Sequence, residues 1–162
     1  MSDWISLRGL ALLVAANSAP VVAAWIAGSR VNWPLDGGKV MKDGRQVLGA
    51  HKTWRGLGAA VLLAGGVALA LGQSFGAGAA FGAAAMLGDA LSSFIKRRLD
   101  CRPGAWLPGL DQLPEAALPL WLGYGFLDLD TVSFTGTLLA FSGLDLIASR
   151  TLGSSRRHNR PG

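Results

Sequence analysis

The sequence predicts an all-α polytopic membrane protein with about five transmembrane helices and a cytoplasmic loop that contains a short β-hairpin. Three observations support this fold class. Hydrophobic residues make up 51% of the 162 residues, uncharged stretches of bilayer-spanning length recur along the chain, and charged residues cluster between them. The length favours a single membrane domain, which we expect over residues 1–153, followed by a basic, disordered tail over residues 154–162.

The first expected helix covers residues 7–27. No charged residue occurs from Gly9 to Ser29, and this length suits a retained spanning helix better than the shorter apolar core of a signal peptide. Pro20 interrupts the segment, and a neighbouring helix would accommodate the backbone groups that it frees.

A polar loop follows, from Gly28 to about Lys52. Its Asp43-Gly44 pair is a hairpin signal, so we expect short strands at residues 39–41 and 46–48. Loops of this length usually carry function or are disordered, and the hairpin signal favours an ordered loop.

Two further helices are expected at residues 53–71 and 75–99. The stretch from Leu57 to Gly88 carries no charge and is too long for a single span, and Gly72-Gln73-Ser74 provides the break. The two helices therefore form an antiparallel pair that begins and ends on the loop side.

A second polar loop covers residues 100–113 and precedes the last two expected helices. The first of these, residues 114–126, is short for a span and contains Pro119. The second covers residues 131–148. The single cysteine, Cys101, excludes an intrachain disulfide.

The distribution of basic residues predicts the orientation of the chain in the membrane. Every lysine and arginine except Arg8 lies in the two polar loops, at their edges or after the last helix, and with five spans these segments share one side. The positive-inside rule therefore predicts an integral protein of the cytoplasmic (inner) membrane, with the N-terminus outside and both loops and the C-terminus cytoplasmic. A three-span arrangement, with the last two helices as a re-entrant hairpin, keeps the same sides. We expect no nucleic-acid partner, because the basic residues lie in short clusters between apolar segments.

Asp89 lies well inside the apolar segment expected as the third helix. An ionisable residue at this depth is costly unless it faces a cavity or a partner, which makes Asp89 a functional candidate. At helical spacing, five further side chains share its face: Ser92, Ser93, Lys96, Arg97 and Asp100. The alternative is a helix end whose basic residues simply lie at the membrane surface.

The two loops add the side chains that a nucleoside triphosphate with Mg²⁺ requires. Hard oxygen ligands hold the metal, and cationic side chains and free backbone N–H groups hold phosphate oxygens. The loop residues of these types are Asp36, Lys39, Lys52, Thr53, Arg55 and Asp111. Basic residues also flank spans in proteins that bind no nucleotide, so that alternative stays open.

Four motifs carry a family resemblance. In chain order they are Pro34-Leu35-Asp36-Gly37-Gly38-Lys39, Lys52-Thr53-Trp54-Arg55-Gly56, the segment from Gly88-Asp89 to Lys96-Arg97-Arg98, and Leu110-Asp111-Gln112. On these motifs the chain resembles the CDP-archaeol synthase family of small, CTP-dependent membrane cytidylyltransferases. It is more distantly similar to the CTP:phosphatidate cytidylyltransferases. The motifs cover about residues 30–113, and the length and helix count extend the resemblance to the whole chain.

The resemblance implies an activity and its residues. CMP would pass from CTP to a lipid phosphate, giving a CDP-lipid of the CDP-archaeol or CDP-diacylglycerol type and pyrophosphate, with Mg²⁺ as cofactor. CTP, a membrane lipid phosphate and the bilayer are the implied partners, and a homodimer stays open. The implied catalytic residues are Asp89, Lys96, Arg97 and Asp111, of which Asp89 and Asp111 would bind the metal. The implied nucleotide-binding residues are Asp36, Gly37, Gly38, Lys39, Lys52, Thr53, Arg55 and Ser93.

Two other classes remain as alternatives. A non-catalytic membrane scaffold or transporter subunit would account for the spans and basic loops, but it gives no reason for Asp36, Asp89 and Asp111 to lie toward the basic side. For a membrane lipid kinase or phosphatase, the sequence contains no histidine-centred nucleophile arrangement of the kind a phosphatase would use.

Overall fold

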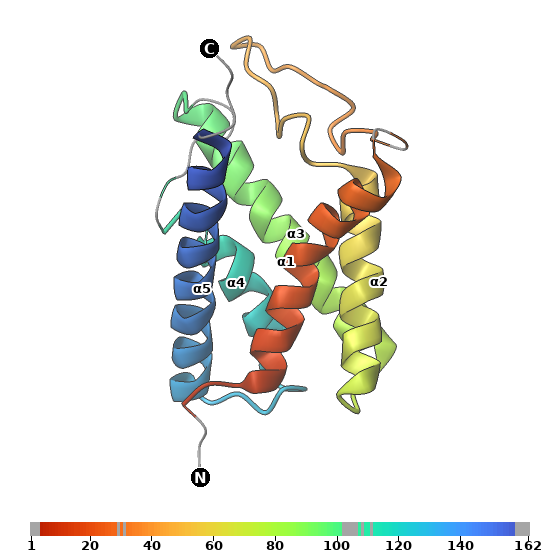
Figure 1. Cartoon of the computed structure of the whole chain (residues 1–162), viewed down its shortest axis with the longest axis vertical. Coiled ribbons are helices and arrows are strands. Elements are labelled where there is room, and N and C mark those ends of the chain that lie inside the picture. Colours follow the sequence, from red (N-terminus) through yellow and green to blue (C-terminus); the bar gives the residue numbers. More distant parts are fainter. Residues whose placement is uncertain are drawn as a thin grey trace.

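Helices form the framework of the chain, as Figure 1 shows. The computed structural model describes residues 4–28, 30, 32–101, 107, 109–110 and 112–157, with side chains described as far as Ala148. The five helices of this described part are α1 (Leu7–Ala27), α2 (Trp54–Ala70), α3 (Phe75–Arg98), α4 (Gln112–Leu122) and α5 (Thr131–Arg157).

Hydroxyl side chains begin the first three helices. Ser6 accepts a hydrogen bond from the N–H of Gly9, Thr53 from that of Gly56, and Ser74 from that of Ala77. Each bond satisfies a first-turn N–H group that has no partner within its helix, and such a cap stabilises a helix by about 1 kcal/mol. The caps fix where each helix starts, close to the boundaries expected from hydropathy.

Small residues bring α2 and α3 together. A Cβ atom added to Gly82 would lie 2.5 Å from the backbone oxygen of Ala60, and one added to Gly78 would overlap the backbone of Ala64. Close backbone approach through glycine and alanine is a common way for helices to associate inside a membrane. The core of the bundle lies where these helices meet α1 and α4, and its largest fully buried apolar side chains are Leu12, Leu13, Phe81 and Leu120.

Within the described part of the chain, three segments are long and apolar enough to cross a membrane: α1, α3 and residues 131–148 of α5. The chain is thus an integral membrane protein. At 1.5 Å per residue, the 17 residues of α2 reach about 26 Å and the 11 residues of α4 about 16 Å. A hydrocarbon core of about 30 Å is too thick for α4 to cross. The expected number of helices is confirmed, but five full spans is too many.

The short helix α4 begins inside the bundle. A Cβ atom added to Gly88 would overlap the backbone oxygen of Pro114, so the start of α4 lies directly against α3. Gly88 is about 15 Å before the C-terminal end of α3 at Arg98. The chain therefore returns from that end to the middle of α3 before α4 starts.

The loop between α1 and α2 lies at the same end of the molecule as the C-terminal ends of α3 and α5 (Figure 1). The Asp43-Gly44 turn forms, with Gly44 at a φ of 75°. A single antiparallel bridge, between Val40 and Gln46, stands where two strands were expected at residues 39–41 and 46–48. The hairpin prediction is thus right for the turn and wrong for the strands, since a lone two-stranded ribbon is marginal without a third strand.

The last helix extends beyond its expected end. Hydropathy placed this end at residue 148, whereas α5 continues to Arg157, and no proline lies between these positions to stop it. The helix thus enters the segment expected as a disordered tail, whose residues 158–162 lie outside the described part of the chain. The division into residues 1–153 and a tail stays a prediction.

Gly82→Ala should lower the midpoint of thermal unfolding in detergent, because the new methyl group would force α2 and α3 apart. Overpacking of this kind costs about 1–3 kcal/mol. Gly76→Ala on the same helix is the matched control, since nothing lies within 4 Å of its Cβ position. It should leave stability unchanged or raise it, because glycine inside a helix is unfavourable. Equal midpoints for Gly82→Ala and the wild type would contradict the close contact.

Candidate functional site

An ion pair between Lys52 and Asp89 forms the centre of the site. The Nζ atom of Lys52 lies 2.5 Å from Oδ2 of Asp89, and the two side chains are only 20% and 25% exposed. Asp89 is about 14 Å before the C-terminal end of α3. The structure thus brings together two predicted site residues from distant parts of the chain, well below the loop end of the bundle.

The backbone around Lys52 is held by the first part of the α1–α2 loop. The N–H of Leu35 donates to the carbonyl of Lys52 (2.7 Å), and the N–H of Trp54 donates to the carbonyl of Trp33 (3.1 Å). Thr53 lies between them, where its buried hydroxyl caps α2. These bonds hold the backbone of Lys52 in place, so its side chain extends toward Asp89 from a fixed position.

Asp36 shapes the loop through its own carboxylate. Its Oδ1 accepts from the N–H of Gly38 (2.9 Å), and its Oδ2 accepts from Leu48 (2.8 Å) and Gly49 (3.3 Å). Burial alone would raise the pKa of Asp36, but these three hydrogen bonds to the charged form outweigh it and lower the pKa. Each oxygen of the Asp36 carboxylate already accepts from a backbone N–H group. The carboxylate therefore stabilises the loop and is less suited to binding a ligand.

The glycines after Asp36 leave space beside the backbone, although the N–H of Gly37 donates to the carbonyl of Pro34 and that of Gly38 donates to Asp36. Gly37 and Gly38 have φ values of 62° and 73°, a region that other residues rarely adopt. Nothing lies within 4 Å of a Cβ position at either glycine, and Lys39 follows with an exposed side chain. This segment is therefore an accessible turn at the loop end of the molecule.

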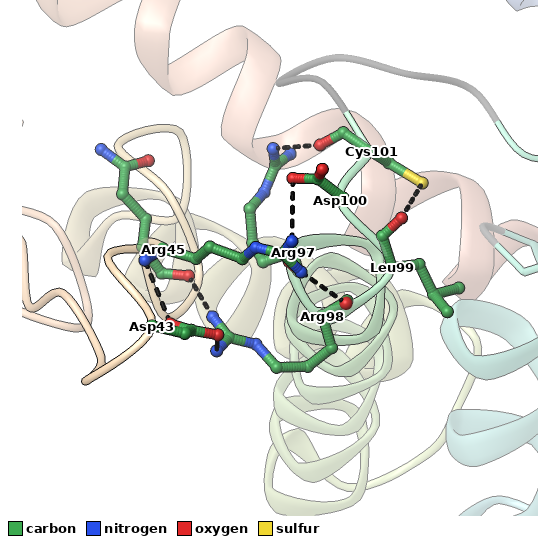
Figure 2. A network of polar contacts seen from close by, with 8 residues as sticks. Asp43, Arg45, Arg97, Arg98, Leu99, Asp100 and Cys101 are labelled. Carbon is green, nitrogen blue, oxygen red and sulfur yellow. Dashed lines mark hydrogen bonds and ion pairs between the residues drawn. The ribbon is translucent and has the colours of Figure 1, made fainter.

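Figure 2 shows a second network, which joins the hairpin to the C-terminal end of α3. Arg45 donates to the carbonyl of Arg98 (2.8 Å) and pairs with Asp100 (3.2 Å). Arg98 in turn donates to Asp43 (2.5 Å) and to the carbonyl of Gln46 (2.9 Å). Each arginine thus contacts the segment that carries the other, and Arg45 donates to a carbonyl at the end of α3 that lacks a partner within the helix. Sequence reasoning gave Arg45 no role, because nothing local links it to a helix far along the chain.

The remaining predicted residues of α3 lie on the turns after Asp89. Ser93 is buried, and Lys96 and Arg97 are half-buried. Arg97 donates to the carbonyl of Cys101 (2.9 Å), and its Nε–H is buried without a hydrogen-bond partner among the described residues. A buried donor without a partner is costly, and an anion would satisfy it.

Arg55 holds the end of α1. Its guanidinium donates to the carbonyls of Gly28 and Arg30, both at 2.8 Å, and lies 3.4 Å from Oδ1 of Asn32. Helix C-termini leave carbonyls without partners, and an arginine can supply the missing donors. Here Arg55 ties α2 to α1, and its predicted contact with nucleotide stays a prediction.

The second predicted metal ligand, Asp111, lies outside the described residues. Its neighbour Gln112 is 3% exposed and has both ends of its amide bonded. Oε1 accepts from the N–H of Gly109 (2.8 Å), and Nε2 donates to Oδ2 of Asp145 on α5 (3.1 Å). Sequence reasoning gave Asp145 no role, although an ionisable residue within an apolar helix is a recognisable signal.

The donor set at Asp89 suits a magnesium ion shared with a substrate. Within the described residues, no three histidine, cysteine or acidic side chains gather into a metal site. Mg²⁺ commonly binds through one or two carboxylates together with substrate phosphates and water, so a part-exposed Asp89 beside a triphosphate is sufficient. A protein-only cage is not required.

Apolar grooves lie elsewhere on the bundle. One of about 340 Å³ runs between α1 and α2 and is lined by residues such as Ile26 and Leu62. Another of about 730 Å³ lies beside Trp4 and Leu139. Neither includes Lys52 or Asp89, so these grooves are separate from the ion-pair site.

Comparison with known proteins places the chain in a family. The family described as CarS-like, CDP-archaeol synthase, matches residues 68–139. The CDP-archaeol synthase of Hyperthermus butylicus is 37% identical, over 91% of this chain and 90% of its own length. That of Methanopyrus kandleri is 40% identical, over 76% of this chain and 75% of its own length.

A solved structure shows the same architecture. It belongs to an intramembrane enzyme for archaeal membrane lipid biosynthesis, is 30% identical, and superposes with a TM-score of 0.71 over 92% of this chain and 99% of its own. The resemblance drawn from four sequence motifs is thereby confirmed, and it extends beyond residues 30–113 to nearly the whole chain. The chain belongs to the CDP-archaeol synthase family.

Proposed function

We propose that this chain transfers CMP from CTP to the phosphate of an isoprenoid ether lipid, giving a CDP-archaeol-type lipid and pyrophosphate. The observation that carries the proposal is the Lys52–Asp89 pair, an anion-binding and a cation-binding group side by side inside a membrane bundle. Family membership supplies the reaction class, a nucleotidyl transfer that uses CTP. The position of the ion pair between the α1–α2 loop and α3 supports a meeting point there for a nucleotide and a membrane-embedded phosphate.

The chemistry requires little proton transfer. An oxygen of the lipid phosphate attacks the α-phosphorus of CTP, and a new P–O bond forms there. The bond from that phosphorus to the oxygen bridging the α- and β-phosphates breaks, and pyrophosphate leaves with the electron pair. A phosphomonoester has a second pKa of about 6 and is largely dianionic near neutral pH, so no general base is needed. The protein's task is to align two anions and to stabilise the charge on the departing group.

The central pair fits this task. Asp89, with Asp111 as a second ligand, would hold Mg²⁺, which when bound neutralises triphosphate charge as a Lewis acid. Lys52, the cationic partner of Asp89, would bind phosphate oxygens. Lys96 and Arg97 follow on α3 and would hold the lipid phosphate or the α-phosphate. Arg97 has a buried Nε–H without a partner among the described residues, as Arg55 and Arg98 also do, and these donors support anion binding at this end of the bundle.

The α1–α2 loop would close over the nucleotide. The free space at the Cβ positions of Gly37 and Gly38 supports close approach by the substrate, and Lys39 adds a charge beside them. The bond from Arg98 to Asp43 supports a loop that is held at the end of α3, above Asp89. We further propose that Ser93, Thr53 and Arg55 line the nucleotide side, and that this end faces the cytoplasm because the basic residues gather there.

The direct test uses purified protein in detergent with Mg²⁺, labelled CTP and two lipid phosphates in parallel. One carries ether-linked isoprenoid chains and the other ester-linked acyl chains. We expect labelled lipid and free pyrophosphate in equal amounts with the ether-linked substrate. The absence of labelled lipid with both substrates would favour the non-catalytic scaffold or transporter subunit.

Asp89→Asn should reduce kcat by at least about 100-fold, because the variant removes a charged group that acts on the triphosphate. Circular dichroism should show an unchanged helix content. Asp128→Asn is the matched control, since Asp128 is exposed in the turn before α5, at the end of the molecule away from the loops. Its φ of 51° is also tolerated by asparagine. An Asp89→Asn protein with wild-type turnover would remove this residue from the site.

Lys52→Met should raise the KM for CTP about 10-fold or more, because a charge-assisted hydrogen bond contributes about 1.5–3 kcal/mol. Lys42→Met, at an exposed position in the same loop, controls for loss of positive charge and should leave KM unchanged. Steady-state kinetics with varied CTP measures both. If Lys42→Met and Lys52→Met raised KM equally, general attraction by the basic loop would explain the effect and a specific contact would not.

A further inference from the structure

We propose that Asp145 on α5 is a positioning residue for the transfer reaction: through the amide of Gln112 it fixes the start of α4 against α3 beside Asp89. The inference rests on the proposed function and adds to it a residue that lies on neither of the two polar loops. Asp145 acts on the site through Gln112 and touches no substrate in this account.

The first observation is an unbroken chain of contacts from α5 to the loop before α4. Oδ2 of Asp145 accepts from Nε2 of Gln112 at 3.1 Å, and Oε1 of Gln112 accepts from the N–H of Gly109 at 2.8 Å. Gln112 is 3% exposed, so water cannot readily replace either bond. The orientation of one buried amide therefore links α5 to the backbone that leads into α4.

The second observation is that this link holds the start of α4 next to Asp89. The start of α4 lies against α3 at Gly88, where an added Cβ would overlap the carbonyl of Pro114 and lie 2.8 Å from the N–H nitrogen of Glu115. Gly88 directly precedes Asp89 in α3. A shift of α4 along α3 would therefore change the surroundings of Asp89 at once, and misplacement by about 1 Å can slow a reaction about 100-fold.

The third observation is the chemical nature of the two side chains. Asp145 lies in the part of α5 that is apolar enough to span the membrane, where an ionisable residue is costly and usually functional. An ionised carboxylate only accepts hydrogen bonds, so it fixes the amide of Gln112 with its NH₂ group toward α5 and its oxygen toward Gly109. Apolar packing between α4 and α5 would stabilise the bundle without specifying that orientation.

The test compares five variants with the wild type: Asp145→Leu, Asp145→Asn, Gln112→Ala, the double variant Asp145→Leu with Gln112→Ala, and Ser142→Ala. Asp145→Leu suits a membrane-spanning helix but leaves the buried Nε2 of Gln112 without its acceptor, so it should fold with a somewhat lower melting midpoint. Ser142→Ala is the control on the same helix, because its hydroxyl donates to the carbonyl of Leu138 within α5. Kinetics with varied CTP, and thermal unfolding in detergent, are measured for each protein.

We expect Asp145→Leu to lower kcat about 10- to 100-fold while the KM for CTP stays close to the wild-type value, because alignment is lost and binding is kept. Asp145→Asn should restore most of kcat, since its amide oxygen can still accept from Gln112. Gln112→Ala should lower kcat to a similar extent, and the double variant should be no slower than either single variant. Ser142→Ala should match the wild type.

Three results would overturn the inference. An Asp145→Leu protein with wild-type kcat would show that no positioning is needed. Equal losses in Asp145→Asn and Asp145→Leu would assign the carboxylate a direct role through its charge. Losses that multiply in the double variant would show that Asp145 and Gln112 act independently. If the wild type itself forms no CDP-lipid, the proposed function fails instead, and the two failures are thereby distinguished.

Discussion

An ion pair well inside a membrane bundle is the constraint on which the rest of the structure depends. Charges at the depth of Asp89 are costly in hydrocarbon, and the cost falls when they are paired and shielded by protein. The fold meets this condition by bringing Lys52 down from the start of α2 to a carboxylate on α3. Three neighbouring features help to hold the ion pair in place: the Thr53 cap, the Leu35–Lys52 backbone bond, and the glycines that let α2, α3 and α4 approach closely.

The polar residues of the loop end offer two kinds of interaction. Asp36, Arg45, Arg55 and Arg98 donate to or accept from the backbone at 2.8–2.9 Å and hold the loop on the helix ends. Lys39 has an exposed side chain, and a buried Nε–H without a partner among the described residues occurs on Arg55, Arg97 and Arg98 alike. This arrangement suits an enzyme that binds a polyanion, because the arginines hold the loop in place and still carry buried donors that an anion would satisfy. The same contacts explain how the loop end, with its many positive charges, stays ordered.

Hydropathy and the Gly72-Gln73-Ser74 break were sufficient to predict α1, α2 and α3, whereas α5 continues past its expected end at residue 148 to Arg157. The turn Gly72-Gln73-Ser74 and the cap at Thr53 are local features, so α2 and α3 begin and end near their expected positions. Motifs also identified Lys52 and Asp89, because rare charges near or inside apolar segments stand out in a sequence. Contacts between distant residues were beyond such reasoning. The Arg45–Arg98 exchange and the Gln112–Asp145 bond join residues far apart in the chain without any periodic signal. The missing hairpin strands likewise depend on tertiary packing, which local propensity does not contain, whereas a short α4 was expected from the sequence.

The central claim is that nucleotide and metal meet between Lys52 and Asp89. Anomalous diffraction from crystals of the protein grown with CTP and Mn²⁺, a magnesium substitute with a measurable signal, tests it most directly. The account predicts a manganese peak within coordinating distance of the Asp89 carboxylate, with Nζ of Lys52 turned toward a phosphate oxygen. A manganese–CTP complex bound elsewhere, with the Lys52–Asp89 pair still closed, would contradict it.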